Sequence, residues 1–152
     1  MIETIKGDIT WSKADYICHQ VNCQGKMNSG VAKAIRERWP KVYDFYLREN
    51  IGKSWEHMLG HIQEVPVNET QSVINMFAQY TYGYDGRRYT SYDAFWSCLG
   101  EIRAQVPKGK TIAFPRYIGC VRGGANWNIV YTMIVEVLGE DYNIEFWDYD
   151  GG

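Results

Sequence analysis

Strand-like and helix-like segments alternate along this 152-residue chain, and the alternation restricts the folds open to it. Runs typical of strands are "MIETIKGDIT", "ADYICHQV", "LGHIQEVPV", "QSVINMFAQ", "KTIAFP" and "YNIEFWDY". Apolar residues recur at helical spacing in residues 29–47, in "YTSYDAFWSCLGEIRAQV" and in "NWNIVYTMIVEVLG". The chain starts strand-rich, and strands and helices then alternate. This order predicts a three-layer α/β/α fold with a central mixed sheet of about six strands.

Three residues mark the ends of the expected helices. Pro40 lies inside the first helical run, so we expect a break there or a new helical first turn near it. Thr90 or Ser91 is expected to cap the second helix, because hydroxyl side chains accept hydrogen bonds from free N–H groups. Gly139 is expected to end the last helix.

Composition and charge exclude several classes of protein. Hydrophobic residues make up 45% and charged residues 22%, as in an ordinary globular domain, and we expect one domain over residues 1–152. A pI of about 5.9 argues against bulk nucleic-acid binding but allows a small anion in a local pocket. No apolar run approaches the ~20 residues of a membrane span, and no signal-peptide pattern opens the chain. We therefore expect a cytoplasmic monomer without membrane contact.

The cysteines and histidines do not follow a metal-binding pattern. Cys18, Cys23, Cys98 and Cys120 form no CxxC pair, which favours free thiols in a reducing compartment. The segment "HMLGH" lacks the glutamate of a zinc-protease helix. Neither a metal nor a cofactor is expected.

Two glycine-containing segments connect predicted strands to predicted helices. They are "NCQGKMNSGV", which contains no acidic residue, and "RYIGCVRGGANW". Ligands of α/β sheets lie beyond the carboxyl ends of the strands, where such segments gather. Glycine permits close backbone approach, and a helix N-terminus favours an anion. Two facing segments of this kind indicate a diphosphate ligand, although a single one is also common without any ligand.

Together with "KGDI" near the N-terminus, these two segments resemble the macrodomain family over essentially the whole chain. The order is the same: "GDI" after the first strand, an asparagine at the end of the second, and "PRYIGCVRGG" before the last helix. The chain most resembles small bacterial and phage macrodomains related to ADP-ribose 1″-phosphate phosphatases and to the hydrolases that remove ADP-ribose from glutamate. The resemblance implies ADP-ribose, ADP-ribose 1″-phosphate or an ADP-ribosylated protein as the partner.

The resemblance also implies roles for individual residues. Asp8 would accept a hydrogen bond from the adenine amino group, and Asn22 would hold the distal ribose. The alternatives are a plain turn at Asp8 and an asparagine bonded to its own backbone at Asn22. The two glycine segments would bind the distal ribose and the diphosphate through backbone N–H groups. The expected ligand-binding residues are Asp8, Ile9, Gln20, Asn22, Gly25, Met27, Asn28, Ser29, Gly30, Val31, Gly119, Cys120, Val121, Arg122, Gly123 and Gly124.

The sequence departs from the family at several positions. Asn28 stands where relatives usually carry glycine, and Lys26 replaces a small apolar residue. Val121 and Arg122 occupy positions often filled by glycine and a small residue. Hydrolases that remove ADP-ribose from glutamate use an acid in the second segment and a lysine after the fourth strand. Neither is present in "GCVRGGANW" or "FAQYTYG", which speaks against that reaction.

Three residues are candidates for catalysis: His19, Asp85 and Asn22. His19 matches a histidine implicated in phosphatase members, and an unperturbed pKa of ~6.5 would suit it to proton transfer. It could equally be a core histidine. Asp85 could act as a base or belong to an Asp-Gly turn in "YDGRR". Cys120 adjoins a helix start, which could lower its pKa.

We expect a protein that binds ADP-ribose-type ligands and hydrolyses the 1″-phosphate of ADP-ribose 1″-phosphate, and two alternatives stay open beside this hydrolysis. One alternative is a binding module that captures ADP-ribose, free or attached to protein, without turnover. The other is a hydrolase that removes ADP-ribose or acyl groups from other macromolecules, although the acid–lysine pair expected for it is not present.

Overall fold

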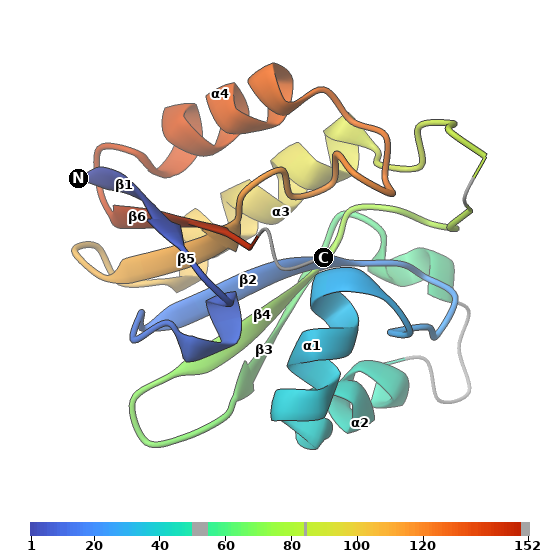
Figure 1. Cartoon of the computed structure of the whole chain (residues 1–152), viewed down its shortest axis with the longest axis horizontal. Coiled ribbons are helices and arrows are strands. Elements are labelled where there is room, and N and C mark those ends of the chain that lie inside the picture. The colour runs from blue at the N-terminus through green and yellow to red at the C-terminus, as the bar shows by residue number, and fades with distance from the viewer. Residues whose placement is uncertain (50–54, 84, 150–152) are drawn as a thin grey trace.

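The strands form one mixed sheet. The computed structural model describes residues 1–49, 55–83 and 85–149 (Figure 1). Within them the sheet order is β1-β6-β5-β2-β4-β3, and only the β3–β4 pair is antiparallel. The strands are β1 (Ile2–Lys6), β2 (Tyr16–Val21), β3 (Ile62–Pro66), β4 (Ser72–Phe77), β5 (Thr111–Pro115) and β6 (Asn143–Asp148). The predicted mixed α/β sheet is confirmed.

Helices cover both faces of this sheet. Figure 1 shows α3 and α4 on one face and α1 and α2 on the other, which makes the three expected layers. None of the helices in the described ranges is long and apolar enough to cross a membrane. The helices are α1 (Gly30–Arg38), α2 (Pro40–Arg48), α3 (Tyr92–Gln105) and α4 (Trp127–Leu138), with short 3-10 turns η1 (Ile9–Trp11) and η2 (Trp55–Met58).

The helix ends follow the local signals in the sequence. Helix α1 stops at Arg38, and Pro40 is the first residue of α2, where its missing N–H costs nothing. Of the two expected caps of α3, Ser91 is the cap: its hydroxyl accepts a hydrogen bond from the Ala94 N–H. Gly139 caps the C-terminus of α4.

The core is divided by the sheet into two apolar clusters. Because side chains alternate along a strand, Ile17 and Val21 of β2 face α1 and α2, and Cys18 faces α3 and α4. All four cysteines are free thiols. The α3–α4 cluster includes Phe95, Leu99, Ile102, Val130, Ile134 and Leu138; the other includes Ile35, Val42 and Tyr46.

Two neighbouring aromatic residues of α3 test this core assignment. Phe95 is 0% exposed and Trp96 is 49% exposed. We expect Phe95→Ala to lower the free energy of unfolding by about 3–5 kcal/mol, because it leaves a cavity in the α3–α4 cluster. Trp96→Ala should cost about 1 kcal/mol or less. Urea denaturation of both variants measures this, and equal losses would contradict the assignment.

Candidate ligand site at the carboxyl edge of the sheet

The loops that follow the parallel strands gather at one end of the molecule. We call residues 22–29 (after β2) the first loop, 116–126 (after β5) the second loop and 78–91 (after β4) the third loop. The sheet order places β2 between β5 and β4, so the three loops are neighbours (Figure 1). The two glycine segments singled out in the sequence therefore lie at the same edge, which we call the carboxyl edge.

The pairing of β2 with β5 is short. Its register contains only Tyr16 with Ile112 and Ile17 with Ala113. Beyond these pairs β2 continues along β4 as far as Val21, and β5 continues along β6. In α/β sheets, ligands bind where the connections that follow two neighbouring strands lead to opposite faces of the sheet. The first loop leads from β2 to α1 on one face, and the second loop leads from β5 to α4 on the other (Figure 1).

The side chain of Asn22 builds the first loop. Its Oδ1 accepts hydrogen bonds from the Gln24 N–H at 2.9 Å and lies 2.9 Å from the Tyr46 hydroxyl. Its Nδ2 donates to the Lys26 carbonyl at 3.0 Å. The alternative of an asparagine bonded to its own backbone therefore describes Asn22 in this structure.

Other residues of the first loop also point back into the protein. Met27 is 1% exposed and packs in the α1–α2 cluster, so its side chain is not available to a ligand. The Asn28 Oδ1 accepts a hydrogen bond from Arg36 Nη1 at 3.1 Å. Met27 is thus withdrawn from ligand contact, whereas the side chain of Lys26 is exposed beside the loop backbone.

The N-terminus of α1 lacks a side-chain cap. Ser29 is its cap residue but makes no side-chain cap hydrogen bond, and no acidic residue lies in the first turn. The N–H groups of Gly30 and Val31 cannot be satisfied within the helix and carry part of its positive end. Helix α4 differs, because the Asn126 Oδ1 accepts from the Asn128 N–H at 2.8 Å. The N-terminus of α1 is thus free of a side-chain cap, whereas in α4 the Asn126 side chain occupies one of the N–H groups expected to be free.

The second loop presents unpaired amides. The Gly119 carbonyl accepts from the Ala125 N–H at 3.0 Å, and the Gly123 carbonyl accepts from the Thr90 N–H at 3.0 Å. Within the described residues, the N–H groups of Val121, Gly123 and Gly124 have no hydrogen-bond acceptor. Val121 is 82% exposed. The loop thus turns carbonyls inward and leaves a group of neutral donors unused.

Thr90, from the third loop, holds the second loop in place. It is 2% exposed, and its hydroxyl donates to the Gly119 carbonyl at 2.8 Å. A Cβ on Gly123 would lie 2.2 Å from the Thr90 Oγ1 and 2.5 Å from the Gly119 carbonyl oxygen. Sequence reasoning took Thr90 only for a possible helix cap. Its contact with Gly119 spans 29 residues, and no local pattern reveals such a contact.

Gln20 supports the second loop from below. Its Nε2 donates to the Thr90 hydroxyl at 2.8 Å and to the Gln79 Oε1 at 2.7 Å. Its own Oε1 is buried without a hydrogen-bond partner. The family resemblance implies that Gln20 binds the ligand, whereas in the structure its amide nitrogen is used within the protein.

Asp8 keeps one oxygen unused. Its Oδ1 caps η1 by accepting from the Thr10 N–H at 2.9 Å and the Thr10 hydroxyl at 2.8 Å. Within the described ranges, its Oδ2 has no hydrogen-bond partner. Ile9 is 4% exposed and packs in the α1–α2 cluster, so its side chain is not available to a ligand. Asp8 therefore makes a turn and still has an acceptor to offer.

His19 lies in the core and not among the loops. Its ring is 1% exposed, and the Nε2 is 2.5 Å from the Asn75 Oδ1. Burial lowers its pKa from 6.5 to about 4, against the smaller opposing effect of the Asn75 hydrogen bond. The ring is therefore neutral at pH 7, which corrects the expectation of a near-neutral pKa.

The other reactive candidates are also occupied. Asp85 accepts a hydrogen bond from the Tyr89 hydroxyl at 2.7 Å and pairs with Arg87 Nε at 3.0 Å. The Tyr89 hydrogen bond, more than Arg87, holds the pKa of Asp85 below its ordinary value. Burial raises the pKa of the Cys120 thiol to about 11, so the lowering that a nearby helix start could have caused is not found. Asp85 and Cys120 thus have protein partners and no arrangement suited to attack on a ligand.

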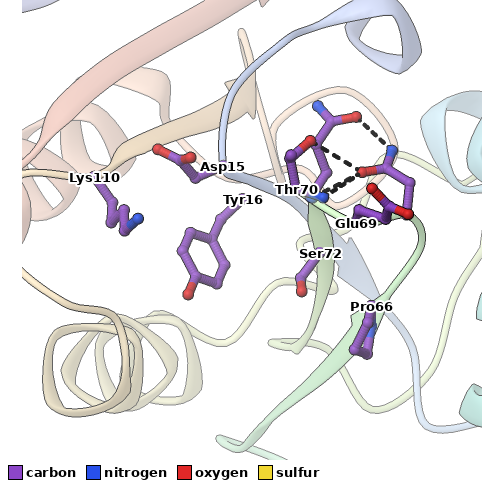
Figure 2. Close-up of a pocket in the computed structure, with 9 residues that line it drawn as sticks. Asp15, Tyr16, Pro66, Glu69, Thr70, Ser72 and Lys110 are labelled. Carbon is purple, nitrogen blue, oxygen red and sulfur yellow. Dashed lines mark hydrogen bonds between the residues drawn. The ribbon is translucent and has the colours of Figure 1, made fainter.

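A shallow hollow lies at the opposite edge of the sheet. Its volume is about 200 Å³, and Figure 2 shows Asp15, Tyr16, Glu69 and Lys110 around it. Tyr16 is the first residue of β2, so this hollow is at the amino edge, away from the three loops. It is therefore separate from the candidate site.

Comparison with known proteins gives the class of the molecule. No protein-family model matches the sequence, and no curated protein matches it either. Solved structures do match. A Bacteroides thetaiotaomicron protein is 26% identical with a TM-score of 0.79, over 97% of this chain and 99% of that one. A macrodomain protein from Streptomyces coelicolor is 26% identical with a TM-score of 0.69, over 100% of both chains. Thermosipho africanus DarTG in complex with ADP-ribose is 17% identical with a TM-score of 0.73, over 93% of this chain and 40% of that one.

These matches define an α/β domain with the macrodomain fold, whose loops meet beyond the carboxyl ends of parallel strands. The chain thus has the macrodomain fold and is similar over its whole length to a macrodomain protein, in agreement with the resemblance of its sequence.

The packing of Gly123 on Thr90 generates a stability test. We expect Gly123→Ala to lower the free energy of unfolding by about 1–3 kcal/mol, because the new methyl group overlaps Thr90 and Gly119. The matched control is Gly100→Ala, where a Cβ meets nothing within 4 Å inside α3. That variant should be more stable than wild type by about 0.5–1 kcal/mol. Thermal unfolding of both variants measures whether each change raises or lowers stability. Stabilisation by both changes would contradict the close packing of Gly123 on Thr90.

Buried His19 predicts a pH-dependent stability. Its pKa is about 4 when folded and ~6.5 when unfolded, so the unfolded chain binds the proton first as the pH falls. His19 should therefore cost about 3 kcal/mol of stability between pH 6.5 and pH 4. His19→Gln lacks this ionisation. Denaturation curves of wild type and the variant from pH 7 to pH 4 measure the difference, and parallel curves would contradict the prediction.

Proposed function

We propose that this macrodomain binds ADP-ribose at the carboxyl edge, with the diphosphate between the first and second loops. The supporting observation is the set of backbone donors left unused on both loops: Gly30 and Val31 on one side, and Val121, Gly123 and Gly124 on the other. Oriented amide groups bind anions without side-chain charge. Such a site suits a chain whose net charge is −2.

The arrangement of strands supports a diphosphate in particular. The two donor groups follow β2 and β5, which are neighbours in the sheet. The two loops begin beyond the place where β2 and β5 separate, one on each side of it. Two linked phosphates supply one anionic group for each set of donors.

The adenine end of the ligand would lie toward β1. Asp8 follows β1 and keeps its Oδ2 available to accept from an exocyclic amino group. The order β1-β6-β5-β2 separates Asp8 from the first loop by the width of several strands. A nucleotide with a second ribose is long enough to extend along this edge. The similar DarTG structure holds ADP-ribose.

The geometry favours binding over hydrolysis. The 1″-phosphatase hypothesis relied on His19, Asp85 and Asn22. His19 is buried and neutral, Asp85 is paired with Arg87, and the Asn22 amide holds its own loop. A phosphatase would need a proton donor or positioned base beside the distal ribose. We therefore propose capture of ADP-ribose as the main function and keep 1″-phosphate hydrolysis as the alternative.

Phosphorus NMR distinguishes these functions. We expect the diphosphate resonances of ADP-ribose to shift or broaden with purified protein, because the loop amides bind them. ADP-ribose 1″-phosphate should do the same without releasing inorganic phosphate. Asp8→Ala should lower the affinity for ADP-ribose about tenfold, because the variant loses one hydrogen bond to a charged group.

Glu69→Ala, at the amino-edge hollow, is the matched control and should bind like wild type. Growth of inorganic phosphate would favour the phosphatase. Unchanged diphosphate resonances with the wild-type protein would rule out the proposed site.

A further inference from the structure

The side chain of Tyr46 connects helix α2 to the first loop. It is 0% exposed, and its hydroxyl lies 2.7 Å from the Asn22 carbonyl, to which it donates. The same oxygen accepts a hydrogen bond from the Gly25 N–H at 3.0 Å. A single buried hydroxyl thus binds the backbone at both the start and the middle of the loop.

The ring of Tyr46 is fixed by aromatic packing. Its centroid lies 4.9 Å from that of Trp55 and 5.6 Å from that of Phe77. Phe77 is the last residue of β4, so the ring rests on the sheet itself. Burial raises the pKa of the Tyr46 phenol, which keeps it protonated as a donor. The hydroxyl position is consequently set by the core and not by the loop.

Tyr43 binds the same loop one helical turn earlier. Its hydroxyl donates to the Gly25 carbonyl at 3.1 Å, so α2 holds both the N–H and the C=O of Gly25. The Arg36 guanidinium lies 3.8 Å above the Tyr43 ring and also donates to Asn28. Gly25 has a φ of +73°, a conformation that other residues adopt only with strain.

A buried polar network holds α2 in turn. The Gln63 Nε2 donates to the Phe45 carbonyl at 2.6 Å and to the Glu49 Oε1 at 3.1 Å, near the end of the helix. The Gln63 Oε1 accepts from the Asn75 Nδ2 at 2.9 Å, and Asn75 is bonded to His19. His19 therefore lies at one end of a chain of contacts that crosses β2, β4 and β3 to reach α2.

We propose that Tyr46 is a positioning residue that holds the first loop, and with it the α1 N-terminus, in the binding conformation. The inference rests on the proposed function of that loop. Tyr46 does not touch the ligand. It keeps Gly25 and the unpaired amides of Gly30 and Val31 in place for the distal half of ADP-ribose. Removal of the Tyr46 hydroxyl should therefore lower the affinity for ligands that reach the first loop. It should not change the affinity for ligands that end at the adenosine half.

The variant Tyr46→Phe tests this role and keeps the ring packing. Hydrogen exchange of the Gly25 amide should become at least about tenfold faster, because its acceptor is lost. Affinity for ADP-ribose, by calorimetry, should fall about tenfold, as one or two hydrogen bonds no longer order the loop. Affinity for adenosine 5′-monophosphate should stay within about twofold.

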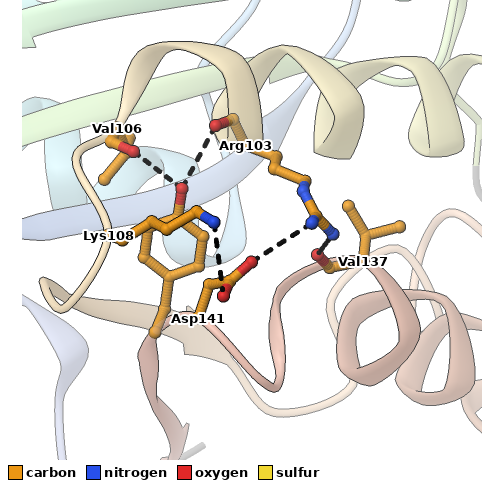
Figure 3. A network of polar contacts seen from close by, with 6 residues as sticks. Arg103, Val106, Lys108, Val137 and Asp141 are labelled. Carbon is orange, nitrogen blue, oxygen red and sulfur yellow. Dashed lines mark hydrogen bonds and ion pairs between the residues drawn. The ribbon is translucent and has the colours of Figure 1, made fainter.

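The matched control is Tyr142→Phe. Tyr142 is 3% exposed, and its hydroxyl donates to the Val106 carbonyl at 2.7 Å and lies 3.2 Å from the Arg103 carbonyl. It precedes β6 and so lies at the amino edge, next to Asp141, whose ion pairs with Arg103 and Lys108 are shown in Figure 3. This variant loses similar hydrogen bonds but should leave both ligand affinities and the Gly25 exchange unchanged.

Each outcome has one meaning. Unchanged ADP-ribose affinity in Tyr46→Phe, or an equal loss for both ligands, would overturn the positioning role. If wild type itself fails to bind ADP-ribose, the proposed function is wrong, and the Gly25 exchange still tests whether the Tyr46 hydroxyl holds the first loop.

Should Tyr46→Phe not fold, Tyr43→Phe removes one hydrogen bond to Gly25. It should lower the affinity for ADP-ribose about threefold and leave the affinity for adenosine 5′-monophosphate unchanged. No such loss in a folded Tyr43→Phe would then overturn the inference.

Discussion

The short parallel pairing of β2 with β5 is the contact on which the whole site depends. It joins the two halves of the sheet through Tyr16–Ile112 and Ile17–Ala113 and then ends. Because it is parallel, the loops that follow both strands meet at one edge. Because it is short, the strands separate before these loops begin. A longer ladder would place the glycine loops against each other and leave less room for a ligand between their amides.

Much of the fold could be predicted from the sequence because its signals are local. The helix break at Pro40, the cap at Ser91 and the end of α4 at Gly139 each depend on residues within one turn. The two glycine loops could be predicted for the same reason. The direction of one strand follows from the length of its connection. Strand β3 is antiparallel to β4 because only a short turn connects them, whereas parallel strands need a crossover.

The roles of individual site residues could not be predicted, because they depend on distant partners. His19 and Gln20 are adjacent in β2 and face opposite sides of the sheet, so one meets Asn75 and the other Thr90. The sequence of β2 does not show which polar residue of another segment lies on each face of the sheet. Tyr46 looked like an ordinary core residue at helical spacing. Its bond to Gly25 spans 21 residues and has no signature in either segment.

The supports under both loops have one physical consequence. Loop backbone costs about 1–2 kcal/mol per residue to order, and a mobile loop would meet that cost at the moment of binding. Here Thr90 fixes the second loop and Tyr46 the first through side chains that are themselves buried. The loops are therefore ordered when the protein folds, and the packing of the hydrophobic core offsets the free-energy cost of ordering them. The order of both loops therefore depends on core residues of α2 and on Thr90 of the third loop, so a substitution there alters the candidate site without touching it.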